Sequence, residues 1–154
     1  MKFLIKDNIN IIKKVKAERK KIVFTNGCFD LLHVGHIRYL AQAKKLGDFL
    51  IIGLNSDSSV KALKGKDRPI NSFEDRAVLL SALTSVDLVI IFEELTPENL
   101  IKEIVPDVLV KGGDYNIKDI VGFQTVIQNG GLVKSLSFYD GYSTTNYIKK
   151  INKP

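Results

Sequence analysis

The chain has 154 residues and only two histidines, His33 and His36, which lie three positions apart. Residues with this spacing occupy one side of a helical turn, so both rings can face the same group if a helix begins between them. Imidazole N–H groups donate hydrogen bonds to anions. Gly35, between the two, places no side chain in the way of a ligand. The spacing therefore predicts that the pair contacts one phosphate group.

The segment around the pair, residues 25–36, has further features of an anion site. It follows a short apolar run, and Gly27 within it lets a ligand approach the backbone closely. A helix that begins near Gly35 directs its free N–H groups and its positive dipole end toward the same space. The simpler alternative is that two surface histidines merely flank a helix start. Cys28 lacks a neighbouring base, so we interpret it as a packing residue of this loop rather than a reactive thiol.

Two other segments carry groups suited to phosphates. Lys64, Lys66 and Arg68 form a basic loop that can hold phosphate oxygens, although a solvated loop would have the same composition. The run from Ser143 through Thr144 and Thr145 precedes a predicted final helix and offers hydroxyl and backbone N–H groups, of which an ordinary helix cap would use only one hydroxyl; these three residues, 143–145, are predicted to bind phosphate.

A third segment, Lys111-Gly112-Gly113-Asp114, leaves the end of a predicted strand. Its glycines can admit a ribose or a base, and the Asp114 carboxylate can accept hydrogen bonds from hydroxyls. A plain tight turn would have a similar composition.

The elements that must position these groups are short apolar runs alternating with helical patterns. Five runs are predicted strands: 21–25, 49–54, 88–92, 108–111 and 132–137. Helical spacing predicts helices over 34–46 and 72–83, and a helical extension over 1–20 before a single domain over 21–154. The alternation predicts an α/β fold: a Rossmann-like, doubly wound, parallel five-stranded sheet with helices on both faces, which binds ligands at the carboxyl ends of its strands.

Several residues mark predicted helix ends. Ser72 with Asp75 three positions later resembles a capping box. Thr96 followed by Pro97 fits an N-cap with proline in the first helical position. Gly130, followed by another glycine, marks a helix end before the last strand.

Composition narrows the class of partner. The formal net charge of +6 favours a phosphate-bearing ligand. No nucleic-acid reading motif accompanies this charge, so we predict no nucleic-acid partner. No run is long and apolar enough for a signal peptide or a membrane span, and the single cysteine suits a reducing compartment. The chain is therefore predicted to be cytoplasmic and not to bind a membrane.

The motif His33-Val34-Gly35-His36, preceded by Gly27-Cys28-Phe29-Asp30, resembles the signature of the HxGH nucleotidylyltransferases. Through the segments 111–115 and 141–146 the chain is most similar to one branch, the D-glycero-β-D-manno-heptose 1-phosphate adenylyltransferases. The resemblance covers about residues 21–151. It implies a homodimer that uses ATP and Mg²⁺ to supply ADP-heptose for bacterial surface polysaccharide such as lipopolysaccharide. This enzyme is often fused behind a sugar kinase domain, which we expect here on a separate chain.

The resemblance assigns roles by position in this sequence. His33 and His36 are the catalytic pair, and Lys64, Lys66, Arg68 and Arg76 are expected to bind substrate or phosphate. Arg76 matches an arginine or lysine of related cytidylyltransferases, although a surface charge on a helix is an equal alternative. The expected nucleotide-binding residues are Asn26, Gly27, Cys28, Phe29, Asp30, Gly35, Lys111, Gly112, Asp114, Ser143, Thr144 and Thr145.

These roles predict transfer of the adenylyl group of ATP to D-glycero-β-D-manno-heptose 1-phosphate, with release of pyrophosphate. The first alternative is a CTP-dependent cytidylyltransferase acting on glycerol 3-phosphate or another polyol phosphate. Glycerol-3-phosphate cytidylyltransferases carry an arginine where this chain has residues 138–140, Phe-Tyr-Asp, which disfavours that alternative. A nucleotide-binding module without turnover is the second alternative, disfavoured by the intact histidine pair.

Overall fold

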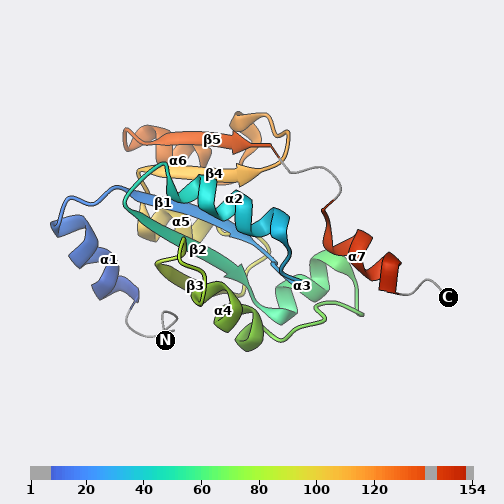
Figure 1. Ribbon diagram of the computed structural model, residues 1–154. Helices are drawn as coiled ribbons and strands as arrows, with labels where there is room; N and C mark the ends of the chain where they lie inside the picture. Colours follow the sequence, from blue (N-terminus) through green and yellow to red (C-terminus); the bar gives the residue numbers. More distant parts are fainter. Residues whose placement is uncertain (1–7, 138–141, 152–154) are drawn as a thin grey trace.

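Five apolar segments form one parallel sheet in the computed structural model, which describes residues 8–137 and 142–151 (Figure 1). The spatial order is β3-β2-β1-β4-β5. The predicted sheet is therefore confirmed. Its strands are β1 (Ile22–Gly27), β2 (Phe49–Asn55), β3 (Leu88–Phe92), β4 (Val108–Gly112) and β5 (Leu132–Leu136).

The strands are apolar on both faces because both faces are covered. In β2, Leu50 and Ile52 pack into one core cluster and Ile51, between them, packs into the other. Val23 and Phe24 of β1 divide in the same way. All of these side chains are fully buried, as expected for parallel strands between two layers of helices.

Helices cover both faces of the sheet (Figure 1). Side chains from α2 and α4 belong to one core cluster, and side chains from α1, α5 and α6 belong to the other. Beyond the carboxyl ends of the central strands lie α3 and α7. The helices are α1 (Asn8–Ala17), α2 (Val34–Lys44), α3 (Asp57–Lys64), α4 (Phe73–Ser81), α5 (Glu98–Ile104), the 3-10 helix η1 (Ile117–Asp119), α6 (Phe123–Gln128) and α7 (Thr144–Ile151).

Most predicted helix ends agree with the structure, and one does not. The Ser72 hydroxyl accepts a hydrogen bond from the Asp75 amide, as a cap of α4 should. Gly130 follows α6 in a left-handed conformation with φ 76°. The predicted cap at Thr96 is wrong: Pro97 is the N-cap residue of α5 and makes no side-chain cap bond. The chain enters the helix one residue later than predicted, which leaves Thr96 on the wall of a pocket.

The first helix contributes to the core through one face. Ile12 and Val15 are buried, whereas Ile9, which has the same helical spacing, is 50% exposed. The boundary of a helical extension at residue 20 stays a prediction. Among the described residues, no helix is long and apolar enough to cross a membrane.

Gly53 in β2 allows a close approach between neighbouring strands. A Cβ atom at this position would lie 2.7 Å from Cζ of Phe24 in β1. Alanine normally suits a strand better than glycine, but here we expect Gly53→Ala to lower the free energy of unfolding by about 1–3 kcal/mol, because the Phe24 ring is fully buried and must move. Urea unfolding measures the change. Adding Phe24→Leu should recover part of the loss, and a Gly53→Ala variant as stable as the wild type would contradict the clash.

Candidate active site

The direction of winding reverses between β1 and β4, which are neighbours at the centre of the sheet. At such a switch point the loops leave adjacent strands in opposite directions and open a crevice at the carboxyl ends of the strands. A cavity of about 790 Å³ lies at this position. It is lined by Gly27 at the end of β1 and by Gly112 at the end of β4, together with the loops that follow them.

The two histidines lie side by side in this pocket. Their rings are stacked, with centroids 3.8 Å apart and planes 17° from parallel. His33 is the N-cap residue of α2, and its Nδ1 atom accepts a hydrogen bond from the His36 amide at 3.4 Å. The imidazole of His33 therefore carries its proton on Nε2 when neutral. The Nδ1 atom of His36 is buried and has no hydrogen-bond partner among the described residues.

Aromatic side chains hold the pair from two directions. The Phe29 ring contacts His36 edge-on, with centroids 5.2 Å apart. The Tyr147 ring of α7 lies nearly parallel to His33 at 5.7 Å. A Cβ atom at Gly35 would lie 3.1 Å from Nδ1 of His33 and 3.0 Å from Cβ of Tyr142. Glycine at position 35 therefore permits the packing of the segment before α7 against the pair.

Burial keeps both histidines neutral in the free protein. It is the main reason that the pKa of His36 falls to about 4, and the neighbouring His33 and Lys64 act in the same direction. Burial also lowers the pKa of His33. At neutral pH each ring therefore offers one N–H donor and one acceptor, and a phosphate that binds beside them will raise their pKa values.

The low pKa of His36 makes folding stability depend on pH. Between pH 6.5 and about 4 the unfolded chain takes up a proton at this residue and the folded chain does not. Acidification through this window should therefore lower the free energy of unfolding, by at most about 3 kcal/mol. Chemical unfolding measured from pH 7 to pH 4 tests this. His36→Gln, which cannot titrate, should show a flatter profile, and equal slopes for the two proteins would refute the assignment.

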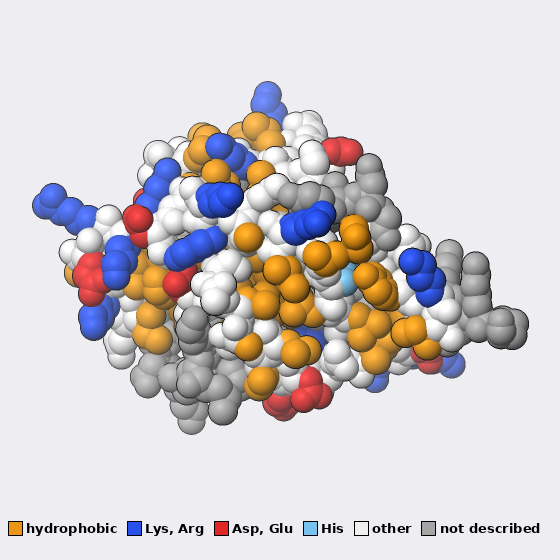
Figure 2. All heavy atoms as spheres, viewed as in Figure 1, with side chains coloured by type: hydrophobic (Ala, Val, Ile, Leu, Met, Phe, Trp, Pro, Cys, Tyr) orange, Lys and Arg blue, Asp and Glu red, His pale blue; other side chains and the backbone are white. Residues whose placement is uncertain are grey.

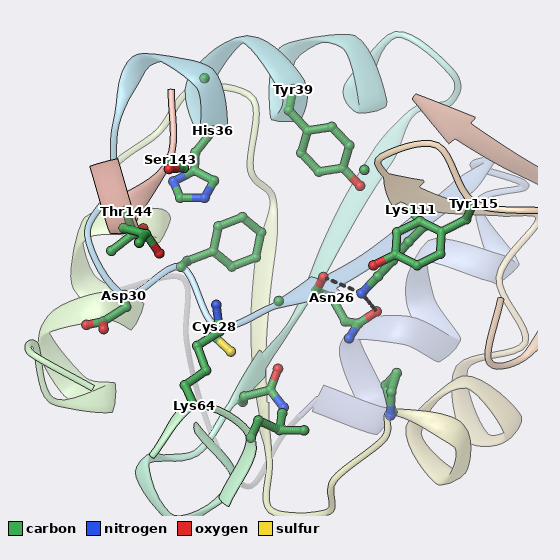
Figure 3. Close-up of a pocket in the computed structure, with 18 of the residues that line it drawn as sticks. Asn26, Cys28, Asp30, His36, Tyr39, Lys64, Lys111, Tyr115, Ser143 and Thr144 are labelled. Carbon is green, nitrogen blue, oxygen red and sulfur yellow. Dashed lines mark hydrogen bonds between the residues drawn. The ribbon is translucent and has the colours of Figure 1, made fainter. Parts of the chain in front are cut away.

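Lys111 lies across the pocket from His36, close to Asn26 (Figure 3). Its Nζ donates two long hydrogen bonds to Asn26, at 3.3 Å to Oδ1 and 3.5 Å to the backbone carbonyl. No ion pair to a carboxylate is present among the described residues, and burial lowers the pKa of Lys111. A desolvated ammonium group with only neutral partners favours an anion in the pocket.

The segment before α7 lies at the same end of the pocket as His36 (Figure 3). The Ser143 hydroxyl accepts from the Asn146 amide at 3.1 Å, so it caps the helix. The Thr144 hydroxyl donates to the carbonyl of Leu31 at 3.4 Å, which ties this segment to the loop before the histidines. Hydroxyl groups and a helix N-terminus thus meet the histidine pair. Figure 2 shows a histidine exposed between hydrophobic side chains on the face viewed there.

The structure brings most of the predicted site residues to one pocket. Its walls include the following predicted residues: Asn26, Gly27, Cys28, Phe29, Asp30, His33, Gly35, His36, Lys64, Arg68, Lys111, Gly112, Ser143, Thr144 and Thr145. Three predicted residues do not line it. Lys66 and Asp114 are exposed elsewhere, and Arg76 is fully buried below the pocket wall.

The prediction that Arg76 binds phosphate does not fit its surroundings. Its three nitrogen atoms donate to protein oxygens of Cys28, Asn71 and Asp57, and its side chain has no exposed surface. The pattern around position 76 signals a helix but not whether a charge on it points outward or inward.

Asp30 also has protein partners where a nucleotide contact was predicted. Only 2% of it is exposed, and its carboxylate accepts hydrogen bonds from the amides of Ile70 and Asn71 and from Nε of Arg68. Arg68 therefore reaches the pocket as part of an ion pair. Its Nη2 atom is buried and has no partner among the described residues.

Several residues that line the pocket were not among the predicted site residues. Tyr39 follows the histidines by one helical turn, and its hydroxyl lies 2.7 Å from the buried Thr25 hydroxyl. Its hydrophobic spacing matches an ordinary core position. Tyr115 lines the pocket from the loop after β4, and Thr96 and Pro97 line it from the loop after β3. Only the sheet order brings these loops together. The segment 138–140, where related cytidylyltransferases carry an arginine, lies outside the described residues.

A parallel sheet in this order, with histidine and lysine side chains in the crevice at its switch point, is typical of α/β nucleotide-binding proteins. Residues 24–150 match the cytidylyltransferase-like family. The chain therefore belongs to this family and is a nucleotidyltransferase.

Curated relatives agree with this family assignment. The chain is 61% identical over 139 residues to the bifunctional protein HldE of Haemophilus ducreyi, and 63% identical over 134 residues to that of Aliarcobacter butzleri. The two alignments cover 90% and 87% of this chain but 29% and 27% of those proteins, so the chain spans less than a third of their length. The crystal structure of the lipopolysaccharide core biosynthesis protein from Thermoplasma volcanium matches with a TM-score of 0.65 at 31% identity, covering 80% of this chain and 99% of that one.

Proposed function

We propose that this enzyme transfers the adenylyl group of ATP to D-glycero-β-D-manno-heptose 1-phosphate and releases pyrophosphate. The observation that carries the proposal is the stacked His33–His36 pair facing the pocket at the switch point. The resemblance of the motif to heptose 1-phosphate adenylyltransferases, and the identity with HldE proteins, support the choice of substrates.

The reaction joins two anions, so the site must reduce their repulsion. A phosphate monoester is largely ionised at neutral pH, because its second pKa is about 6, and its oxygen can attack without a strong base. That oxygen forms a bond to the α-phosphorus of ATP, and the bond from this phosphorus to the oxygen bridging the β-phosphate breaks. Pyrophosphate leaves with the bonding electrons. His33 and His36 donate hydrogen bonds to the oxygens that gain charge.

Cationic and N–H groups surround the proposed phosphate positions. Lys111 and Lys64 line the pocket and reduce the charge of the two substrates. The amino end of α7, with Ser143 and Thr144, offers further donors on the histidine side. These groups supply positioning and electrostatic stabilisation, which are the main requirements of phosphoryl-type transfer.

Mg²⁺ enters the proposal as a companion of the nucleotide. No three His, Cys, Asp or Glu side chains within residues 8–137 and 142–151 lie close enough together to hold a metal ion. In the proposed reaction the ion would shield the negative charge of the β- and γ-phosphates of ATP. We also propose that the enzyme acts as a homodimer in the cytoplasm and supplies activated heptose for surface polysaccharide.

Pyrophosphate release with Mg²⁺ tests the proposal. ATP and CTP are each paired with D-glycero-β-D-manno-heptose 1-phosphate and with glycerol 3-phosphate. Release only with ATP and the heptose phosphate supports the proposed reaction. Release with CTP and glycerol 3-phosphate would identify a polyol phosphate cytidylyltransferase instead, and nucleotide binding without release from any pair would refute the proposal.

A further inference from the structure

The loop that supports His36 contains a residue in an unfavourable conformation. Phe29 has φ 44°, in the left-handed region that residues with a Cβ atom rarely adopt. Its ring is buried and makes the edge-on contact with His36. A Cβ atom at Gly27 would lie 3.0 Å from this ring, so the absence of a side chain at the end of β1 leaves room for the Phe29 ring. Such strain persists only where neighbouring contacts fix it.

Hydrogen bonds to side chains and amides of the segment 70–76 hold the residues on either side of Phe29. Before it, the carbonyl of Cys28 accepts a hydrogen bond of 2.6 Å from Nη1 of Arg76. After it, the carbonyl of Asp30 accepts from the Asn71 side chain at 3.0 Å, and its carboxylate holds the amides of residues 70 and 71. The peptide group before the strained residue, and the residue after it, are thereby anchored to the segment that begins α4.

Arg76 links these anchors. Its Nε donates to the carbonyl of Asn71 at 3.1 Å, and its Nη2 pairs with Asp57 of α3 at 2.7 Å. The planar guanidinium therefore reaches three acceptors in different segments, one of them Cys28. A lysine, with one ammonium group, cannot reproduce this fork. The side chain of Arg76 is fully buried and does not line the pocket, so it has no direct contact with a ligand.

We propose that Arg76 is a positioning residue that, through the carbonyl of Cys28, keeps Phe29 in its left-handed conformation against His36. This inference rests on the proposed function for its effect on turnover, but not for its effect on the His36 ring. When the fork is lost, the 28–30 loop relaxes, the Phe29 ring withdraws and water reaches His36. The donor pair is then misplaced for the transition state, while the groups that bind the nucleotide phosphates elsewhere in the pocket are retained.

Arg76→Lys tests this, with Arg19→Lys as the matched control at an exposed position before β1. The first readout is pyrophosphate release: we expect kcat to fall at least about tenfold while KM for ATP changes by less than about threefold. The second is the pKa of His36 by proton NMR, which is simple because the chain has only two histidines. It should rise by about one unit or more from its value in the wild type, since burial is the main cause of the low value. Arg19→Lys should leave both readouts unchanged.

A purely structural Arg76 would reduce the folded fraction but leave kcat per folded molecule and the His36 pKa at the wild-type values, which would overturn the proposal. If Arg76→Lys does not fold, Asp57→Asn weakens the fork from its more exposed side, and we expect a smaller rise in the His36 pKa. No rise in that variant would likewise overturn it. If the wild type releases no pyrophosphate from any substrate pair, the proposed function fails, and the NMR measurement still decides the role of Arg76.

Discussion

His36→Ala is expected to lower turnover at least about a hundredfold, the usual effect of removing one donor that stabilises charge developing in a transition state. His36 is the more buried of the stacked pair, and its Nδ1 atom has no partner in the described part of the chain. Its ring lines the pocket beside that of His33. Because the effect is confined to the transition state, kcat should fall much more than the affinity for ATP.

Steady-state pyrophosphate release and a separate nucleotide-binding measurement check this prediction. Ile37→Ala is the matched control, because Ile37 is the next residue of α2, is exposed and does not line the pocket. It should retain nearly normal turnover. If His36→Ala also does so, the histidine pair has another role. A loss of ATP binding equal to the loss of turnover would instead assign His36 to ground-state binding.

Lys111→Met should have opposite effects on activity and stability. The Lys111 ammonium is desolvated and is hydrogen-bonded only to the neutral Asn26. Because neither water nor a carboxylate screens its charge strongly, it should attract a substrate phosphate strongly. Removing a charged hydrogen-bond donor of this kind is expected to lower kcat/KM about a hundredfold. In the absence of substrate, the same change removes an unpaired buried charge and keeps the length of the side chain. We expect it to raise the free energy of unfolding by about 1 kcal/mol.

The two effects are measured separately, by pyrophosphate release and by urea unfolding without ligand. Lys118→Met serves as the control, because Lys118 is exposed on η1 and does not line the pocket. It should change neither quantity appreciably. A Lys111→Met variant with normal turnover would show that Lys111 does not contact the substrate. A variant clearly less stable than the wild type would show that Lys111 supports the fold.

Local patterns in the sequence were sufficient to predict the sheet. Five short runs apolar on both faces predicted buried parallel strands, and all five are present. Some strand ends differ from the prediction by one or two residues. In β1, pairing extends beyond the apolar run, because Asn26 and Gly27 pair with Gly53 and Leu54. The helix cap predicted at Thr96 was wrong because the residue types at a helix start do not decide at which residue the backbone enters the helix.

The parts of the candidate site that lie close together in the chain could be predicted, and the parts that come from distant segments could not. His33, Gly35 and His36 lie within one helical turn, so their spacing alone brings them together. Lys111 approaches Asn26 only because β4 lies next to β1, although 85 positions separate the two residues. That neighbourhood follows from the order of the strands, which pairing across the whole sheet determines.

The sequence by itself determined the class of fold and the placement of the two histidines side by side, because each depends on residues close together in the chain. Tertiary structure decided which charges line the pocket with few protein partners. Asp30 and Arg76 have the same residue types that bind substrates elsewhere, yet they are buried and bound to charged or backbone protein groups, whereas Lys111 has only long hydrogen bonds to the neutral Asn26. The distinction depends on whether distant segments supply partners for a charge, and spacing along one chain cannot specify that.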